Sequence, residues 1–131
     1  MFAINPSDPD PIWRQIEDGV RRLVALGALT PGASVPSVRD LARDLRVNPN
    51  TVARAYQRLA ERGVLTVRRG EGTYVADDPA RPRKAEKHGM LRDAAVRYAR
   101  AAIAAGADAD EACDELQAAF DRLVREHRRP A

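Results

Sequence analysis

Two short amphipathic segments separated by only three residues constrain the fold more than any other feature of this chain. Residues 38–45, "VRDLARDL", and residues 49–59, "PNTVARAYQRL", each place apolar side chains on one face of a helix, at i, i+3, i+4 and i+7. These side chains are Val38, Leu41, Ala42 and Leu45 in the first segment, and Val52, Ala55, Tyr56 and Leu59 in the second. Two short helices joined by a tight turn are the layout of a helix-turn-helix.

Capping residues indicate where these two helices begin and end. Ser37, followed three residues later by Asp40, resembles a capping box. Asn48 can accept a hydrogen bond from an N–H of the following helix, and Pro49 suits the first helical position because its missing N–H costs nothing there. Gly63 is expected to follow the end of the later helix.

The flanking segments predict the rest of a first domain. Asp10 is expected to cap a helix with Pro11 in its first turn, and the helical apolar pattern that follows is carried by Ile12, Ile16, Val20 and Leu23. Two β-rich runs, 64–67 and 73–75, flank a glycine turn and predict a hairpin. We therefore expect residues 1–76 to form a winged helix-turn-helix domain, mainly α with a small β-hairpin.

A second region is expected after a linker. Residues 77–88 are rich in proline and charge and lack periodicity, and residues 89–131 predict a C-terminal αα-hairpin. Two helices cover only one face of each other, so we expect this region to bury its other faces in a homodimer. The expected dimerisation residues are Leu91, Tyr98, Leu116, Phe120 and Leu123. The alternative is a monomer in which these helices pack on the first helix.

Positive charge is concentrated in the middle of the chain. Residues 34–69 carry eight arginines against three carboxylates, a net charge of +5, whereas residues 77–131 carry equal numbers of both signs. A basic segment of this size fits a nucleic-acid footprint, although a run of charge is also typical of a solvated surface.

One long stretch resembles a known family. "GASVPSVRDLARDLRVNPNTVARAYQRLAERGVLTVRRGEGTYV" is similar to the DNA-binding domain of the GntR family of bacterial transcription regulators, and the likeness covers roughly residues 11–76. The short tail and "VNPNTVARAY" resemble the YtrA-type branch, small dimeric repressors often encoded beside ABC-transporter genes. The resemblance implies a homodimeric, sequence-specific repressor that binds a palindromic operator and controls a transporter operon.

The expected DNA-binding residues come from helix three (48–62), the entry to the helix before it, and the wing (64–75). The resemblance implies contacts by Arg39, Thr51 and Gly70, while Asn50 and Arg54 share the exposed face of helix three. Arginines outside the base-reading position are expected to hold phosphates, which position the protein without reading sequence. The full expected set is Ser37, Arg39, Asn50, Thr51, Arg54, Arg58, Arg68, Arg69 and Gly70. Other branches carry Arg where this chain has Pro49 and Ala53, so their base-contact scheme does not transfer.

Several of these residues also have a structural interpretation. Arg58 and Arg62 could pair with Glu61 and other surface acids, and Trp13 is expected to anchor the core. A different class of function, a winged-helix module that binds another protein, is disfavoured because protein interfaces favour Tyr, Trp and Met over an arginine-rich face.

The sequence also indicates what to exclude. No nucleophile–base set, phosphate loop or carboxylate pair is present, so we expect no enzyme activity and no cofactor. His88 and His127 are isolated, so no metal site is expected. The single cysteine, Cys113, fits a cytoplasmic protein and is expected to be a small buried hydrophobe. We expect no membrane association. The sequence identifies no small-molecule effector, operator sequence or regulated gene.

Overall fold

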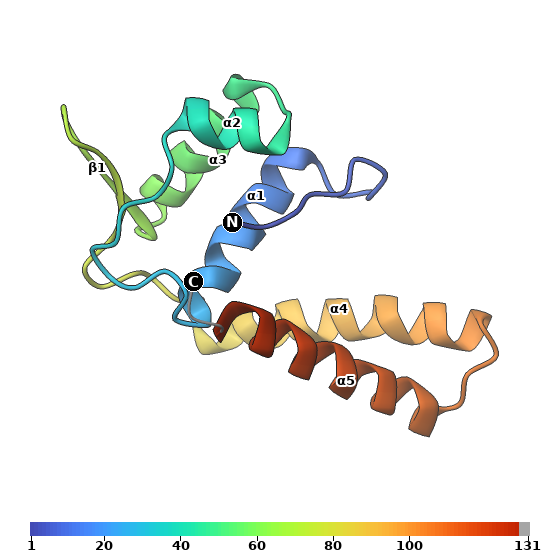
Figure 1. Ribbon diagram of the computed structural model, residues 1–131. Coiled ribbons are helices and arrows are strands. Elements are labelled where there is room, and N and C mark those ends of the chain that lie inside the picture. The colour runs from blue at the N-terminus through green and yellow to red at the C-terminus, as the bar shows by residue number, and fades with distance from the viewer. Residues whose placement is uncertain (129–131) are drawn as a thin grey trace. The chain divides into compact units, whose positions relative to one another are not determined.

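The computed structural model describes residues 1–128 and divides into two compact units, Met1–Ala80 and a second unit that begins at Arg81. Figure 1 shows the order of the elements. They are α1 (Ile12–Ala25), α2 (Val38–Leu45), α3 (Pro49–Glu61), β1 (Leu65–Arg68), β2 (Gly72–Val75), α4 (Lys84–Ala104) and α5 (Ala109–Arg128). Three helices and a hairpin followed by two helices confirm the expected fold class. Within the described residues no helix is long and apolar enough to cross a membrane.

The core of the first unit lies between α1, α3, α2 and the hairpin. It contains most of the apolar positions that the helical pattern predicted, together with residues of the hairpin and the segment before α2: Ile16, Val20, Val35, Leu41, Ala42, Val52, Ala55, Tyr56, Leu59, Val64, Leu65 and Val75. The predicted positions Ile12, Val38 and Leu45 are only partly buried and pack against this core. Tyr56 keeps its polar end satisfied, because its hydroxyl donates to the Pro36 carbonyl oxygen at 2.8 Å. Burial raises the pKa of the Tyr56 phenol, so the hydroxyl stays protonated as this donor requires.

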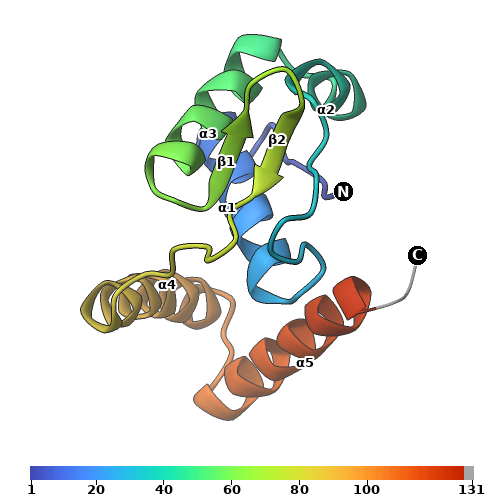
Figure 2. The same cartoon turned by 90° about the vertical axis from the view of Figure 1, so that its left-hand side faces the viewer.

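The wing is an antiparallel hairpin with one additional partner that the sequence pattern did not predict. β1 and β2 pair from Leu65 opposite Val75 to Arg68 opposite Gly72, as Figure 2 shows. The segment around Ser34 lies along the other edge of β2, where the Val75 N–H donates to the Ala33 carbonyl oxygen at 2.8 Å. The wing is therefore tied to the chain just before α2.

Two expected boundaries differ from the structure. Asp10 does not cap α1: Pro11 occupies the N-cap position without a side-chain bond, and the Gln15 amide instead donates to the Asp10 carbonyl oxygen at 3.0 Å. α4 begins at Lys84, within the segment expected to be a linker over 77–88. The charged residues at its start carry no helical apolar period, so the helix could not be detected there from periodicity.

The turn between α2 and α3 holds a backbone conformation that is unusual for its residue. Arg46 adopts φ 57° and ψ 48°, the left-handed region, and is the one non-glycine residue with positive φ among those described. The turn needs this conformation, because the N–H groups of Arg46 and Val47 bond back to the Arg43 and Ala42 carbonyl oxygens. A side chain with a Cβ is strained there.

Replacing Arg46 with glycine is therefore expected to stabilise the first unit. Glycine removes the left-handed penalty but loses more backbone entropy on folding, so the net gain should be about 0.5–1 kcal/mol. Urea unfolding measures this gain. The matched control is Arg39→Gly, which places glycine inside α2 and is expected to destabilise by about 1 kcal/mol. A destabilised Arg46→Gly variant would contradict the strain argument.

The second unit is an αα-hairpin with very little of its own interior. Figure 2 shows α4 and α5 diverging from the loop that joins them. Gly106, at φ 82°, and Asp108, whose Oδ1 accepts from the Glu111 N–H at 2.8 Å, form the turn between the helices. None of residues 81–127 is buried. Cys113 is exposed, so the expectation that it is a small buried hydrophobe is wrong for this chain by itself.

Candidate nucleic-acid interface

The start of α3 presents a polar, uncharged surface that its capping arrangement holds in place. The Asn48 side chain accepts from the Asn50 N–H at 2.8 Å, and Pro49 stands in the first turn, as the sequence predicted. Asn50 is exposed and Thr51 is half-buried. Because both side chains are short, the start of the helix can come close to a base edge.

The start of α2 is organised in the same way. The Ser37 hydroxyl oxygen accepts from the Asp40 N–H at 3.1 Å, which confirms its capping role. Asp40 forms an ion pair with Arg43 one turn later, so these two charges largely neutralise each other. Arg39 is exposed and takes part in no ion pair among the described residues. Arg39 is thus the arginine of α2 that stays available to a phosphate group.

The tip of the wing carries two arginines and a glycine. Arg69 is exposed, and Arg68 places its guanidinium carbon 4.3 Å from the centroid of the Tyr74 ring across the hairpin. Gly70 adopts φ 78°, and a Cβ added there would meet nothing within 4 Å. The glycine is therefore required by the turn conformation, and the space around it is open on the side where a ligand could approach.

A cluster between α1 and α3 changes the interpretation of two residues. Arg58 donates from Nε to Glu17 Oε1 at 2.7 Å, and the Glu17 side chain is only 6% exposed. The sequence suggested Glu61 as a partner of Arg58, but the partner is Glu17, which lies 41 residues away and shares no local pattern with Arg58. Arg58 is thus tied to the domain interior through one of its donors, and a phosphate contact by its remaining N–H groups stays a prediction.

Trp13 joins the same cluster. The guanidinium carbons of Arg54 and Arg58 lie 4.6 Å and 4.5 Å from the centroid of its ring. The ring is half-buried and packs against the core, as expected of an anchor, but it also supports the exposed Arg54. No local sequence pattern connects Trp13 with Arg54, because only the packing of α1 on α3 brings the two side chains together.

The structure places the nine expected DNA-binding residues on α3, at the entry to α2 and on the wing. All belong to the first unit, and all except Thr51 and Arg58 are exposed. No group of three or more His, Cys, Asp or Glu side chains that could hold a metal ion occurs within residues 1–128. The fold and this surface define a winged helix-turn-helix protein of the kind that binds DNA.

The family follows from comparison with known proteins. Residues 13–75 match the model of the bacterial regulatory proteins of the gntR family. A transcriptional regulator of Mycobacterium tuberculosis, Rv1152, is 38% identical over 100 residues, which span 68% of this chain and 79% of that protein. The chain belongs to the GntR family.

Two further similar proteins bear the name YtrA, the branch that the short tail of this chain resembles. The transcriptional repressor YtrA of Bacillus subtilis is 40% identical over 78 residues, which span 60% of this chain and 60% of the relative. A solved structure of YtrA from Sulfolobus acidocaldarius, a GntR-family transcription factor, is 32% identical with a TM-score of 0.54, and the match covers 92% of this chain and 97% of that one. The match to the Bacillus repressor thus spans less than two thirds of its length.

Proposed function

We propose that this chain is a homodimeric transcriptional repressor that binds a palindromic operator in double-stranded DNA. The observation that carries the proposal is the exposed polar face at the start of α3, flanked by the wing arginines. An α-helix fits the major groove, where base edges are distinguishable, and its first turns reach the bases. Relatives named as repressors support regulation of transcription, and the YtrA-like resemblance makes a transporter operon the first target to examine.

In this proposal the basic residues have two roles. Arg54 projects from the exposed face of α3, and a guanidinium can bind the O6 and N7 atoms of guanine with two hydrogen bonds. Asn50 and Thr51 contact bases or phosphates at the same helix start. Ser37 and Arg39 at the start of α2, Arg58 on α3, and Arg68, Arg69 and the Gly70 backbone on the wing bind the phosphate backbone on either side.

The exposed apolar side chains of the second unit support the proposed homodimer. Large apolar side chains are exposed along both helices: Met90, Leu91, Val96, Ile103, Leu116, Phe120 and Leu123. A soluble monomer rarely leaves so many together without a partner. We propose that a second copy covers them, so that residues 89–127 form the dimer interface and two recognition helices face successive half-sites.

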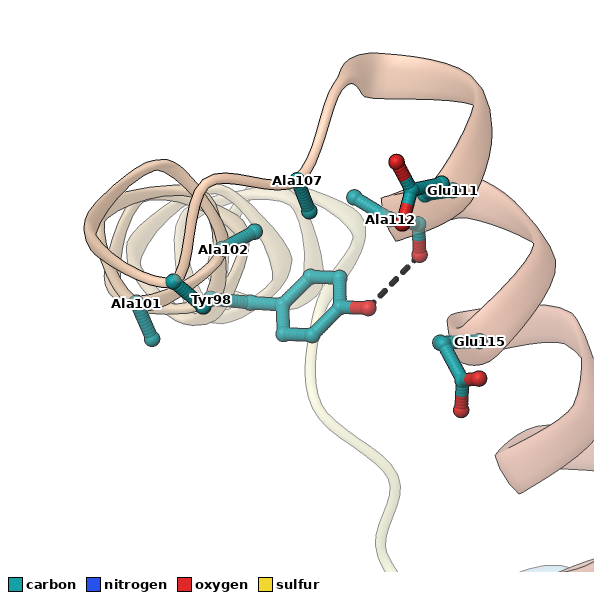
Figure 3. Close-up of a pocket in the computed structure, with 8 residues that line it drawn as sticks. Tyr98, Ala101, Ala102, Ala107, Glu111, Ala112 and Glu115 are labelled. Carbon is teal, nitrogen blue, oxygen red and sulfur yellow. Dashed lines mark hydrogen bonds between the residues drawn. The ribbon is translucent and has the colours of Figure 1, made fainter.

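Tyr98 holds the two helices of each copy together at the closed end of the hairpin. Its ring points from α4 toward α5, and its hydroxyl donates to the Ala112 carbonyl oxygen at 2.6 Å, as Figure 3 shows. Ala101, Ala102 and Ala107 line the groove beside the ring. Small side chains allow a helix to approach closely, so this groove can receive part of the second copy.

Alanine substitutions at Arg54 and Arg69 test the two roles of the arginines. Arg54→Ala should cost about 1–3 kcal/mol on the preferred duplex and relax discrimination at one base pair. Arg69→Ala should weaken preferred and random duplexes evenly and lower the salt slope by about 1. In vitro selection of the preferred duplex followed by competition binding measures both. A protein that selects no sequence, or binds without salt dependence, would favour the protein-interaction alternative instead.

A further inference from the structure

We propose that Trp13 in α1 is a positioning residue for DNA recognition, which orients the Arg54 guanidinium of α3 toward the duplex. This inference rests on the proposed function, because it names the residue that prepares the base-reading arginine. Trp13 itself would contact no base. Its role would be to hold Arg54 before the duplex arrives.

The geometry of the cluster supports this role. The Arg54 guanidinium carbon lies 4.6 Å from the Trp13 ring centroid, within the range of a cation–π interaction, and tryptophan is the strongest aromatic partner for a cation. Trp13 is half-buried and packs on the core, so the ring is a fixed support, whereas Arg54 is exposed. The fixed Trp13 ring therefore restricts the rotamers of the exposed Arg54 side chain.

Contacts with Trp13 and Glu17 offset the repulsion between Arg54 and a second arginine, Arg58. Arg54 and Arg58 carry like charges at i and i+4, a pairing that destabilises a helix. Here the electron-rich Trp13 ring lies against both guanidinium groups, and Glu17 neutralises Arg58 through the 2.7 Å bond. Arg58 is thereby held by two partners, while Arg54 has the ring alone among the described contacts. The cluster ties the Nε donor of Arg58 to the domain interior and leaves every N–H donor of Arg54 for DNA.

A cation–π contact also suits a residue that must later form hydrogen bonds. It uses none of the five N–H donors of the guanidinium, so all of them remain for a guanine edge or a phosphate. It removes part of the rotamer freedom that an exposed arginine would otherwise lose on binding. Because the contact is weak at an exposed site, a small adjustment of Arg54 in the complex costs little.

Binding measurements on two Trp13 variants test the inference. Trp13→Leu is expected to lose about threefold to tenfold in affinity for the preferred duplex and less than about twofold for random DNA. Its salt slope should stay that of the wild type, because no phosphate-binding cation is removed. Trp13→Phe, which keeps an aromatic face, should recover part of the loss. If Trp13 only stabilises the fold, Trp13→Leu should lower the affinity for preferred and random DNA by the same factor. The ratio of the two affinities, and not the salt slope, therefore distinguishes the two roles of Trp13.

Fluorescence provides a second test that needs no Trp13 variant. Trp13 is the single tryptophan of the chain, so its emission reports on this cluster alone. The preferred duplex is expected to change the emission of the wild type and to change that of Arg54→Ala much less. Arg62→Ala, an exposed arginine of the same region, is the control that should respond like the wild type.

Two results would overturn the inference while leaving the proposed function intact. The first is a folded Trp13→Leu variant whose ratio of preferred to random affinity equals that of the wild type. The second is an Arg54→Ala variant whose emission responds to the duplex as fully as that of the wild type. A wild-type protein that prefers no duplex would overturn the proposed function, and this inference with it.

Discussion

Replacing both Leu116 and Phe120 with aspartate is expected to make the protein monomeric and to lower its affinity for a palindromic operator by about 10²–10⁴-fold. The two side chains are 53% and 62% exposed in the single chain, on a unit in which no residue from 81 to 127 is buried. In the proposed dimer they lie in the shared core, where an unpaired carboxylate is costly to bury. Loss of the dimer then removes the advantage of binding two half-sites at once.

Sedimentation analysis at micromolar concentration measures the mass of the wild type and the double variant. The control is Ala118→Asp with Arg125→Gln, which changes the net charge equally on exposed positions of the opposite side of α5 and should leave a dimer. A monomeric wild type, or a Leu116→Asp, Phe120→Asp variant that stays dimeric, would show that the interface is assigned wrongly. Binding to a single half-site should change little in the double variant, since the DNA-binding unit is untouched.

Replacing Arg58 with methionine is expected to destabilise the first unit by about 2–4 kcal/mol, because a buried carboxylate loses its ion-pair partner. Glu17 is 4% exposed as a residue and accepts the Arg58 Nε donor. Methionine keeps much of the side-chain volume against Trp13 but supplies no charge. For a unit of this size the expected lowering of Tm is roughly 10–30 °C.

Thermal and urea unfolding of three variants separate the ion pair from simple packing. Arg62→Met changes an exposed arginine of the same region and should alter stability by less than about 0.5 kcal/mol. The double variant Glu17→Met, Arg58→Met removes both charges and should be more stable than Arg58→Met alone. If Arg58→Met unfolds like the wild type, the Arg58–Glu17 ion pair contributes nothing to the stability of the first unit.

Most of the first unit could be predicted because its signals are local. The i, i+3, i+4, i+7 pattern identified the buried faces of the first three helices, and Asn48, Pro49 and Gly63 marked the limits of α3 within a residue or so. The pairing of the segment around Ser34 with β2 was missed, since a single bridge has no pattern of its own. The start of α4 was missed for a related reason, because the charged residues from Lys84 resemble a linker.

The candidate DNA-binding site likewise contains residues that the sequence could identify and contacts that only tertiary packing makes. The exposed positions of α3, such as Asn50 and Arg54, follow from helical periodicity, and the family resemblance implied the contact by Gly70 at the wing tip. The Arg58–Glu17 ion pair and the contact of Arg54 with Trp13 could not. Both join α1 to α3 across about forty residues of chain, a distance at which no local rule specifies partners.

The amino-acid sequence by itself determined the helices, the tight turn, the glycine wing and the basic middle segment, because propensity, capping and apolar period act over a few residues. Only the tertiary structure decided which arginine stays free. Arg54 and Arg58 lie one turn apart on the same helix. The packing of α1 places the buried Glu17 carboxylate and the Trp13 ring beside Arg58, and the Trp13 ring alone beside Arg54. Long-range packing sets the difference, because the cost of a buried unpaired charge depends on what the fold brings next to it.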